Sequence, residues 1–150
     1  MRRSITMWSR AGRGQSVAEM ALLVPLLLLL VVGAVDLGRA FHSYIVITNA
    51  AREGARYASR FPWLADETRD AAIGEAANSG ISLAAADIFI TPEPPDTWPP
   101  PDPDDPLVAQ PGTAIAVRVE LDFDTILGSV VGLGPLTLRS ETSMVVFGAE

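Results

Sequence analysis

The sequence contains no cysteine, no lysine and a single histidine, His42. Without cysteine the chain cannot form disulfides, thiolate metal sites or a cysteine nucleophile. With so few candidate bases, general-base and nucleophile chemistry is restricted to carboxylates and hydroxyls. Nucleotide-binding, serine-hydrolase and zinc-protease motifs are also missing from the sequence. We therefore predict that the chain is not an enzyme, that it binds no cofactor or metal, and that His42 is an ordinary helix residue.

Positive charge is scarce after the N-terminus. The first fourteen residues contain four arginines and no acid, whereas residues 36–150 contain seventeen acids against seven arginines, a net charge of −10. Because phosphate binding needs clustered positive charge, the acidic part argues against nucleic acid or an anionic lipid face as a partner. The residues beyond the N-terminal segment are enough for one small domain.

One long apolar run, from Met20 to Val35, organises the rest of the chain. As a helix its sixteen residues would cover about 24 Å, less than the roughly 30 Å hydrocarbon core of a bilayer. Starting at Val17 lengthens the span to about 28 Å but brings Glu19 to the membrane boundary, where a carboxylate is either a functional group or an interfacial marker. We predict a single membrane span over residues 17–35, with the arginine-rich N-terminus cytoplasmic and the rest extracytoplasmic.

A cleaved secretory signal is the competing interpretation of this run. The residues at its end, Gly33 to Asp36, offer a poor small-x-small cleavage site, and the helical pattern continues past them. The pair Arg2-Arg3 resembles a twin-arginine export signal, but the apolar run begins too far downstream. We therefore favour an anchor retained in the cytoplasmic membrane.

The helical pattern continues beyond the predicted span. Residues at alternating steps of three and four predict one helix over residues 15–60, about 65 to 70 Å long, with Pro25 expected to kink it or loosen one turn. The stripe consists of Leu37, Phe41, Tyr44, Thr48, Ala51, Ala55 and Ala58.

Two further rows follow the outer half of this helix at a spacing of four residues. Ala50, Gly54 and Ala58 form a row of small residues that permits close approach of another backbone. Arg52, Arg56 and Arg60 form a basic row, with Glu53 three residues before Arg56. The basic row is either a solvated stripe or a contact with the acidic surface of an adjacent subunit.

Residues 61–150 are predicted to form a small domain of helix and antiparallel sheet. Pro62 ends the long helix, and residues 66–78 predict a short helix closed by Gly80, with an apolar face of Ala72, Ile73, Ala76 and Ala77. Short apolar or alternating segments predict strands over residues 87–91, 113–124 and 136–147, the last two pairing antiparallel and packing on the long helix. The inward residues are expected to be Ile115, Val117, Val119, Leu121 and Phe123 in one strand, and Leu138, Met144 and Val146 in the other.

Two connections in this domain are unusual. Residues 92–111 contain nine prolines and four aspartates, which predicts an extended, exposed loop. Asp102, Asp104 and Asp105 lack the glycine and distal glutamate of a calcium loop, so a solvated charge run is expected there. Residues 126–133 are apolar for a soluble connector, and they either fold under the sheet or form a contact patch.

The N-terminal segment resembles a known class of membrane protein. Gly14 to Glu19, followed by an apolar run, is similar to the processing site of type IV prepilins, where a membrane aspartyl peptidase cuts after the glycine. The longer segment, Gly14 to Ser59, closely resembles TadE-like proteins, the minor pilins or pseudopilins of the tight-adherence (Flp) pilus assembly system. The matching residues are Gly14, Gln15, Glu19, Pro25, Asp36, Gly38, Arg39 and the block Asn49–Arg56, with Met20 as a departure from the aromatic residue of the major pilins.

The resemblance implies an α+β, pilin-like fold and a structural function. It implies a leader of residues 1–14, cleavage between Gly14 and Gln15 by a prepilin peptidase, and a new amino terminus for which Glu19 can serve as counter-ion. The implied partners are membrane lipid, the prepilin peptidase, other pilin or pseudopilin subunits and pilus assembly proteins, in the inner membrane or the pilus. The alternative is an uncleaved, membrane-anchored binding or adhesin module that uses the loop 92–111.

Overall fold

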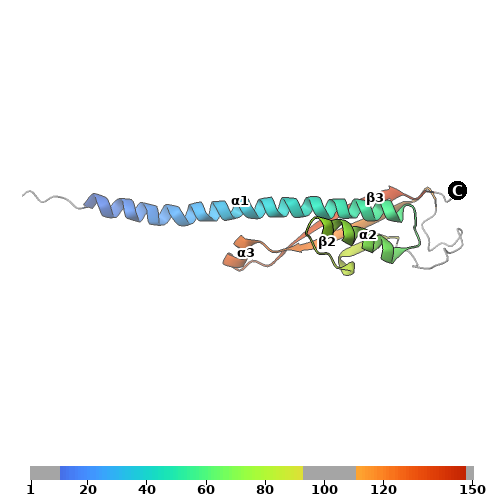
Figure 1. The fold of residues 1–150 in the computed structure, drawn as a ribbon. Helices are drawn as coiled ribbons and strands as arrows, with labels where there is room; N and C mark the ends of the chain where they lie inside the picture. The colour runs from blue at the N-terminus through green and yellow to red at the C-terminus, as the bar shows by residue number, and fades with distance from the viewer. Residues whose placement is uncertain (1–10, 93–110, 148–150) are drawn as a thin grey trace, which may run out of the picture.

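The structure is a computed structural model, and it describes residues 11–92 and 111–147. Within these ranges the elements form one long helix and a small α+β head, as Figure 1 shows. The elements in chain order are α1 (Ala11–Ala58), α2 (Ala65–Asn78), the 3-10 turn η1 (Ala85–Asp87), β1 (Ile88–Thr91), β2 (Ala114–Phe123), α3 (Ile126–Val131) and β3 (Leu136–Val145). The α+β prediction is confirmed. Most of the proline-rich loop, including Asp102, Asp104 and Asp105, lies outside the described residues.

Helix α1 has 48 residues and is therefore about 72 Å long. It begins at Ala11, inside the segment predicted as a leader, and continues through Pro25 without interruption. Figure 1 shows its N-terminal half extending alone, while α2 and the sheet lie along its C-terminal half. After Ala58 the chain turns, and the new helix α2 runs back along α1.

The sheet has the strand order β1-β2-β3, and both pairings are antiparallel. In β2, Val117 lies opposite Ile90 of β1 and Thr142 of β3. The predicted pairing of the last two strands is confirmed, and so is the predicted alternation of β2. Ile115, Val117, Val119 and Phe123 are buried and Leu121 is half-buried, because this face is covered by helices while the other faces outward.

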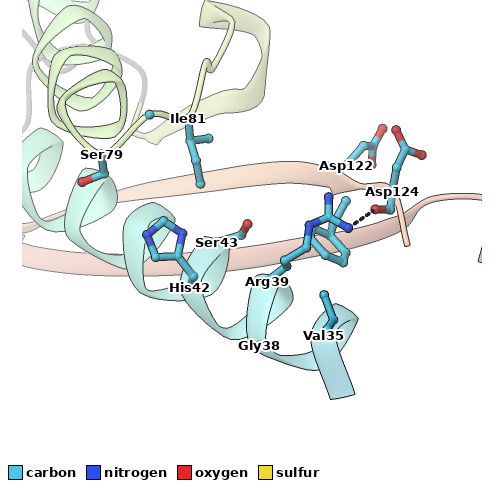
Figure 2. Close-up of a pocket in the computed structure, with 11 residues that line it drawn as sticks. Val35, Gly38, Arg39, His42, Ser43, Ser79, Ile81, Asp122 and Asp124 are labelled. Carbon is cyan, nitrogen blue, oxygen red and sulfur yellow. Dashed lines mark hydrogen bonds between the residues drawn. The ribbon is translucent and has the colours of Figure 1, made fainter. Parts of the chain in front are cut away.

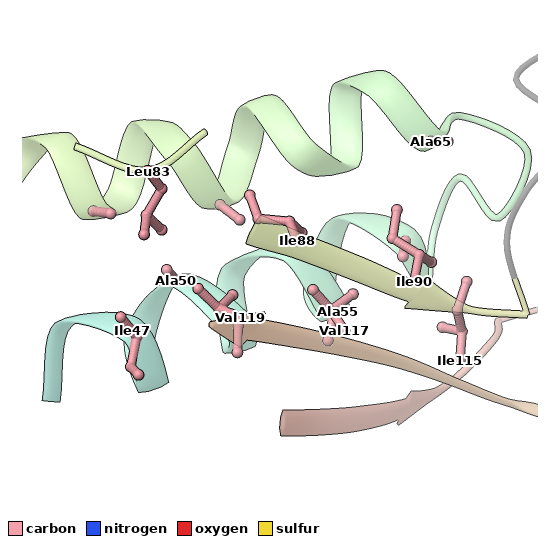
Figure 3. Close-up of a cluster of buried hydrophobic side chains, with 14 of the residues drawn as sticks. Ile47, Ala50, Ala55, Ala65, Leu83, Ile88, Ile90, Ile115, Val117 and Val119 are labelled. Carbon is pink, nitrogen blue, oxygen red and sulfur yellow. The ribbon is translucent and has the colours of Figure 1, made fainter. Parts of the chain in front are cut away.

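The core lies between α1, α2 and the covered face of the sheet. Figure 3 shows this cluster, which is built from branched side chains of the strands, Val46 and Ile47 of α1, and otherwise small side chains of the helices. The small residues let the helices approach closely: a Cβ added at Gly54 would lie 3.1 Å from Cγ1 of Val117 and 3.4 Å from Cβ of Ala72. Beyond the core, the Phe147 N–H donates to the Ser59 carbonyl at 3.0 Å and fastens the end of the β3 segment to the end of α1.

Helix α2 ends as its sequence predicted. Gly80 has a φ of 78°, and the Ile81 N–H donates to the Ala76 carbonyl, so a residue without a Cβ closes the helix. Ala72 and Ala76 are buried and Ile73 packs against the core, but Ala77 is exposed. The prediction for Ala77 was wrong because the face of α2 that meets α1 is narrower than the sequence pattern.

The stripe of residues that predicted the long helix is only partly covered by the head. Leu37, Phe41 and Tyr44 are exposed, with Leu37 at 73%, and only the alanines of the stripe are buried. The covered face is centred elsewhere on the helix, on Ser43, Ile47, Ala50, Ala51, Gly54, Ala55 and Ala58. Serine, glycine and alanine give a weak hydropathy signal, so the larger side chains dominated the sequence pattern.

For the connector between β2 and β3, the structure excludes one of the two expected alternatives. It does not fold under the sheet but forms the short helix α3 at the tip of the hairpin. Thr125 caps this helix by accepting a hydrogen bond from the Gly128 N–H at 2.9 Å. Gly132 ends it with a φ of 77°. Within the other strand, Leu138 and Met144 are half-buried and Val146, just after it, is buried.

The close packing at Gly54 gives a stability prediction. Substituting Gly54→Leu should destabilise the head by about 1–3 kcal/mol, because the added side chain meets Val117 and Ala72 in a filled core. Unfolding of the full chain in detergent by guanidinium, followed by tryptophan fluorescence, measures the change.

Gly74→Leu is the matched control, because Gly74 lies in the interior of helix α2 and a Cβ there meets nothing within 4 Å. Both substitutions gain about the same helix propensity, so their difference isolates the steric effect. Equal stability of the two variants would contradict the packing described for Gly54.

Candidate functional site

The predicted processing residues lie in the exposed, unaccompanied half of α1. Gly14, Gln15 and Glu19 are all exposed, and so is Pro25 two turns further along. The Gln15 side-chain amide donates to the Glu19 carboxylate at 3.2 Å, so these two residues share one face of the helix. The bond between Gly14 and Gln15 lies in the first turn of α1. Reaching this bond therefore requires only the end of the helix to unwind.

A buried carboxylate marks the point where the head begins to cover α1. Asp36 accepts hydrogen bonds from the Ile126 N–H at 2.9 Å and from the Leu127 N–H at 2.7 Å, which are the first two amides of α3. It also pairs with Arg39 at 3.1 Å. The Leu127 N–H, together with the Ile126 N–H and Arg39, holds the pKa of the Asp36 carboxyl below its usual value, although its burial acts in the opposite direction. Asp36 thus ties the tip of the β-hairpin to the long helix.

Arg39 connects the same point to the end of β2. Its guanidinium donates to the Asp124 carbonyl at 3.4 Å and lies 5.1 Å from the centre of the Phe123 ring. Figure 2 shows this arrangement at the side of an open groove of about 630 Å³. His42 and Asp122 also line the groove. In the part of the chain that the structure describes, no group of three or more histidine, aspartate or glutamate side chains is placed to hold a metal ion.

The small-residue row of α1 is used within the chain itself. Ala50, Gly54 and Ala58 are buried in the head, where β2 and α2 make the close approach that the row permits. The basic row lies on the opposite, exposed side. There the Arg56 Nε donates to the Glu53 carboxylate at 2.8 Å, and this bond lowers the pKa of Glu53. Arg52 and Arg60 are exposed as well, so the basic row faces solvent.

Sequence reasoning named Asp36 and Arg39 only through the family resemblance and gave neither a role. The available signal was an acid immediately after an apolar run, with an arginine one turn later. Their partners are the backbone of residues 124–127, about ninety positions along the chain. No local pattern in the sequence connects two segments at that separation.

These features define an α+β protein whose first helix is long and apolar enough to cross a membrane. The most apolar 18-residue stretch of this helix is almost entirely uncovered by the rest of the chain. Residues 14–56 match the family model described as TadE-like protein. Over this segment the chain is similar to TadE-like proteins, and the match covers most of α1 and none of the elements that follow it. No curated protein and no solved structure matches the chain.

The role of Asp36 as an acceptor gives a test by substitution. Asp36→Asn replaces one carboxylate oxygen by an amide that cannot accept the second backbone N–H. Hydrogen exchange of the Ile126 and Leu127 amides in the full chain should accelerate about tenfold or more. Asp70→Asn, the same change at an exposed carboxylate of α2, should leave these two amides unaffected. Unchanged protection in the Asp36 variant would show that the bonds do not hold α3.

The lowered pKa of Asp36 gives a separate prediction for pH. Because the folded pKa lies below the ordinary value of 3.8, the attachment of α3 is fully present above that value and is lost as the pH falls through the folded pKa. The amide resonance of Leu127, followed by NMR in detergent micelles, should therefore titrate with a midpoint below 3.8. A midpoint at or above 3.8 would contradict the assignment.

Proposed function

We propose that this chain is a structural minor pilin or pseudopilin that takes part in assembly of a tight-adherence pilus after cleavage by a prepilin peptidase. The observation that carries the proposal is the start of the family match at Gly14, the residue after which the prepilin-like motif places the cut. The apolar run that follows it is left uncovered by the head. The proposed location is the inner membrane, with the head on the extracytoplasmic side.

Cleavage between Gly14 and Gln15 would change the electrostatics at the end of α1. The new ammonium group would lie one turn from Glu19, whose side chain already contacts that of Gln15. A carboxylate close to a helix N-terminus is favoured by the helix dipole as well as by the ammonium charge. We propose that this pair sets the register of neighbouring subunits, since a charge in an apolar setting needs a fixed partner.

The exposed half of α1 supports the proposal that this subunit moves from lipid into an assembly of other subunits. The large side chains from Val17 to Val31 are exposed, with relative exposures between 43% and 74%. Lipid would cover them in the membrane, and the helices of other subunits would cover them in an assembly. Pro25 interrupts one backbone hydrogen bond in this half, and neighbouring helices can satisfy the freed carbonyl.

The alternative function is a binding or adhesin module that stays uncleaved in the membrane. It would use the loop 92–111, most of which lies outside the described residues. The exposed basic row, Arg52, Arg56 and Arg60, fits either proposal, because it can meet an acidic surface of another subunit or remain solvated. The mature N-terminus separates the two functions.

The proposal predicts a defined loss of mass. In cells that contain a prepilin peptidase, the purified chain should begin at Gln15, and intact-mass spectrometry should show the loss of residues 1–14. A Gly14→Leu variant should stay uncleaved, because the peptidase cuts after a small residue, whereas Gly12→Leu should be processed normally. A wild-type chain that retains Met1 in these cells would favour the anchored module.

Glu19→Gln separates processing from assembly in the same cells. This variant should lose its first fourteen residues yet be depleted from sheared pili, because the new ammonium lacks its partner. Wild-type abundance in the sheared fraction would remove the support for a register role of Glu19.

A further inference from the structure

The tip of the β2–β3 hairpin carries a dense apolar surface. The sequence from Thr125 to Leu138 contains no charged residue, although the chain as a whole is acidic. Within it, five large apolar side chains are exposed, and Val130 and Leu133 are each at least 70% exposed. The five are Ile126, Val130, Val131, Leu133 and Leu136. An apolar cluster of this kind on an acidic head indicates a contact surface.

The tip lies beside the apolar half of α1. Figure 1 shows α3 at the end of the head that faces the uncovered part of the long helix. Asp36 holds the first two amides of α3, and it immediately follows the predicted span. One turn earlier, Val32 and Gly33 are half-buried, whereas residues 14–31 are exposed throughout. The tip is therefore level with the last turn of the span.

The backbone amides at the start of α3 have hydrogen-bond partners within the chain, as a segment without access to water requires. The first three amides of α3 donate to side chains: two to Asp36, and that of Gly128 to Thr125. The Ser129 and Leu133 amides donate to backbone carbonyls at 3.1 and 2.8 Å. The Ser129 hydroxyl donates to the Ile126 carbonyl at 2.7 Å. In water, solvent can pair with the amides that begin a helix, but in a bilayer an unpaired backbone amide is costly.

We propose that α3 and its flanking residues, 126–136, insert into the near leaflet of the bilayer that α1 crosses, as a second membrane contact of the chain. The inference rests on the proposed membrane anchoring of α1. Lipid is the occupant, because the apolar surface of the tip lies beside the last turn of the predicted span. Arg39 then lies at the headgroup level, where its half-exposed guanidinium can reach lipid phosphate. Two contacts, one spanning and one inserted, would fix the tilt of the head against the membrane.

The natural absence of cysteine allows a direct test on the full chain. Single cysteines are introduced at Val130, at Leu27 in the span and at Val145, and each is labelled with an environment-sensitive fluorophore. Val145 is the matched control, since it is also an exposed valine and lies at the opposite end of β3, about 30 Å from the tip. The labelled chains are reconstituted in phosphatidylcholine vesicles, and quenching by spin-labelled lipid is compared with quenching by aqueous iodide.

The expected result is quenching by lipid and loss of iodide quenching at both Val130 and Leu27, with the reverse at Val145. If the Val130 label behaves as the Val145 label while Leu27 stays in lipid, the inference fails and the membrane anchoring stands. If Leu27 is also quenched by iodide, the anchoring fails and the inference fails with it. A third outcome is a Val130 label that neither quencher reaches until the protein is diluted in lipid. That result would show that a second copy of the chain covers α3, and it would overturn the inference.

A second substitution tests the same surface by its chemistry. Val130→Asp should move a label at Leu133→Cys from the lipid-quenched to the iodide-quenched state, because a carboxylate opposes insertion. The same acid at Val145 should leave the Leu133 label unchanged. A Leu133 label that stays lipid-quenched in the Val130→Asp chain would contradict insertion of the tip.

Discussion

The structure depends on one helix that must be compatible with two surroundings. The N-terminal half of α1 exposes leucine and valine on all sides, while the C-terminal half buries alanine, glycine and serine against a folded head. Apart from the bond lost at Pro25, a continuous helix satisfies its own backbone in both halves, so only the side chains need to change. Asp36 stands where the change occurs, with its carboxylate turned toward the backbone of a segment far along the chain. The head is thus fastened to the helix at the point where its exposed apolar half ends.

The core of the head is small in side-chain volume but closely packed. Its helical contributions are mostly alanines and one glycine, and the strands supply the branched side chains that fill the space between them. Chains without disulfides must obtain stability from such packing or from neighbouring subunits. The exposed leucine and aromatic side chains just after Asp36, which are Leu37, Phe41 and Tyr44, show that the head covers only part of α1. An assembly of several copies would have these side chains available for contact.

The length of α1 and the pairing of β2 with β3 could be predicted because each rests on a local period. Helical spacing is continuous from Gln15 to Ala58, and β2 alternates between large apolar residues and alanine or charged residues. The covered face of α1 could not be found in the same way, since apart from Val46 and Ile47 it consists mostly of residues with little hydropathy. The six-residue helix α3 was missed because Gly128 within it and Gly132 after it weaken any helical pattern. Asp36 was missed as a site because the groups that define it belong to a segment about ninety residues away.

The attachment of the head at two levels of α1 has a mechanical consequence. Asp36 holds the hairpin tip beside the middle of α1, and the Ser59 carbonyl holds the amide of Phe147 at the other end of the same hairpin. The two points are 23 residues apart, or about 35 Å along the helix. A pulling force along the helix axis would load both attachments together, in shear rather than one bond after another. The hairpin would then act as a brace that stiffens the outer half of the helix, leaving the uncovered half as the compliant part of the molecule.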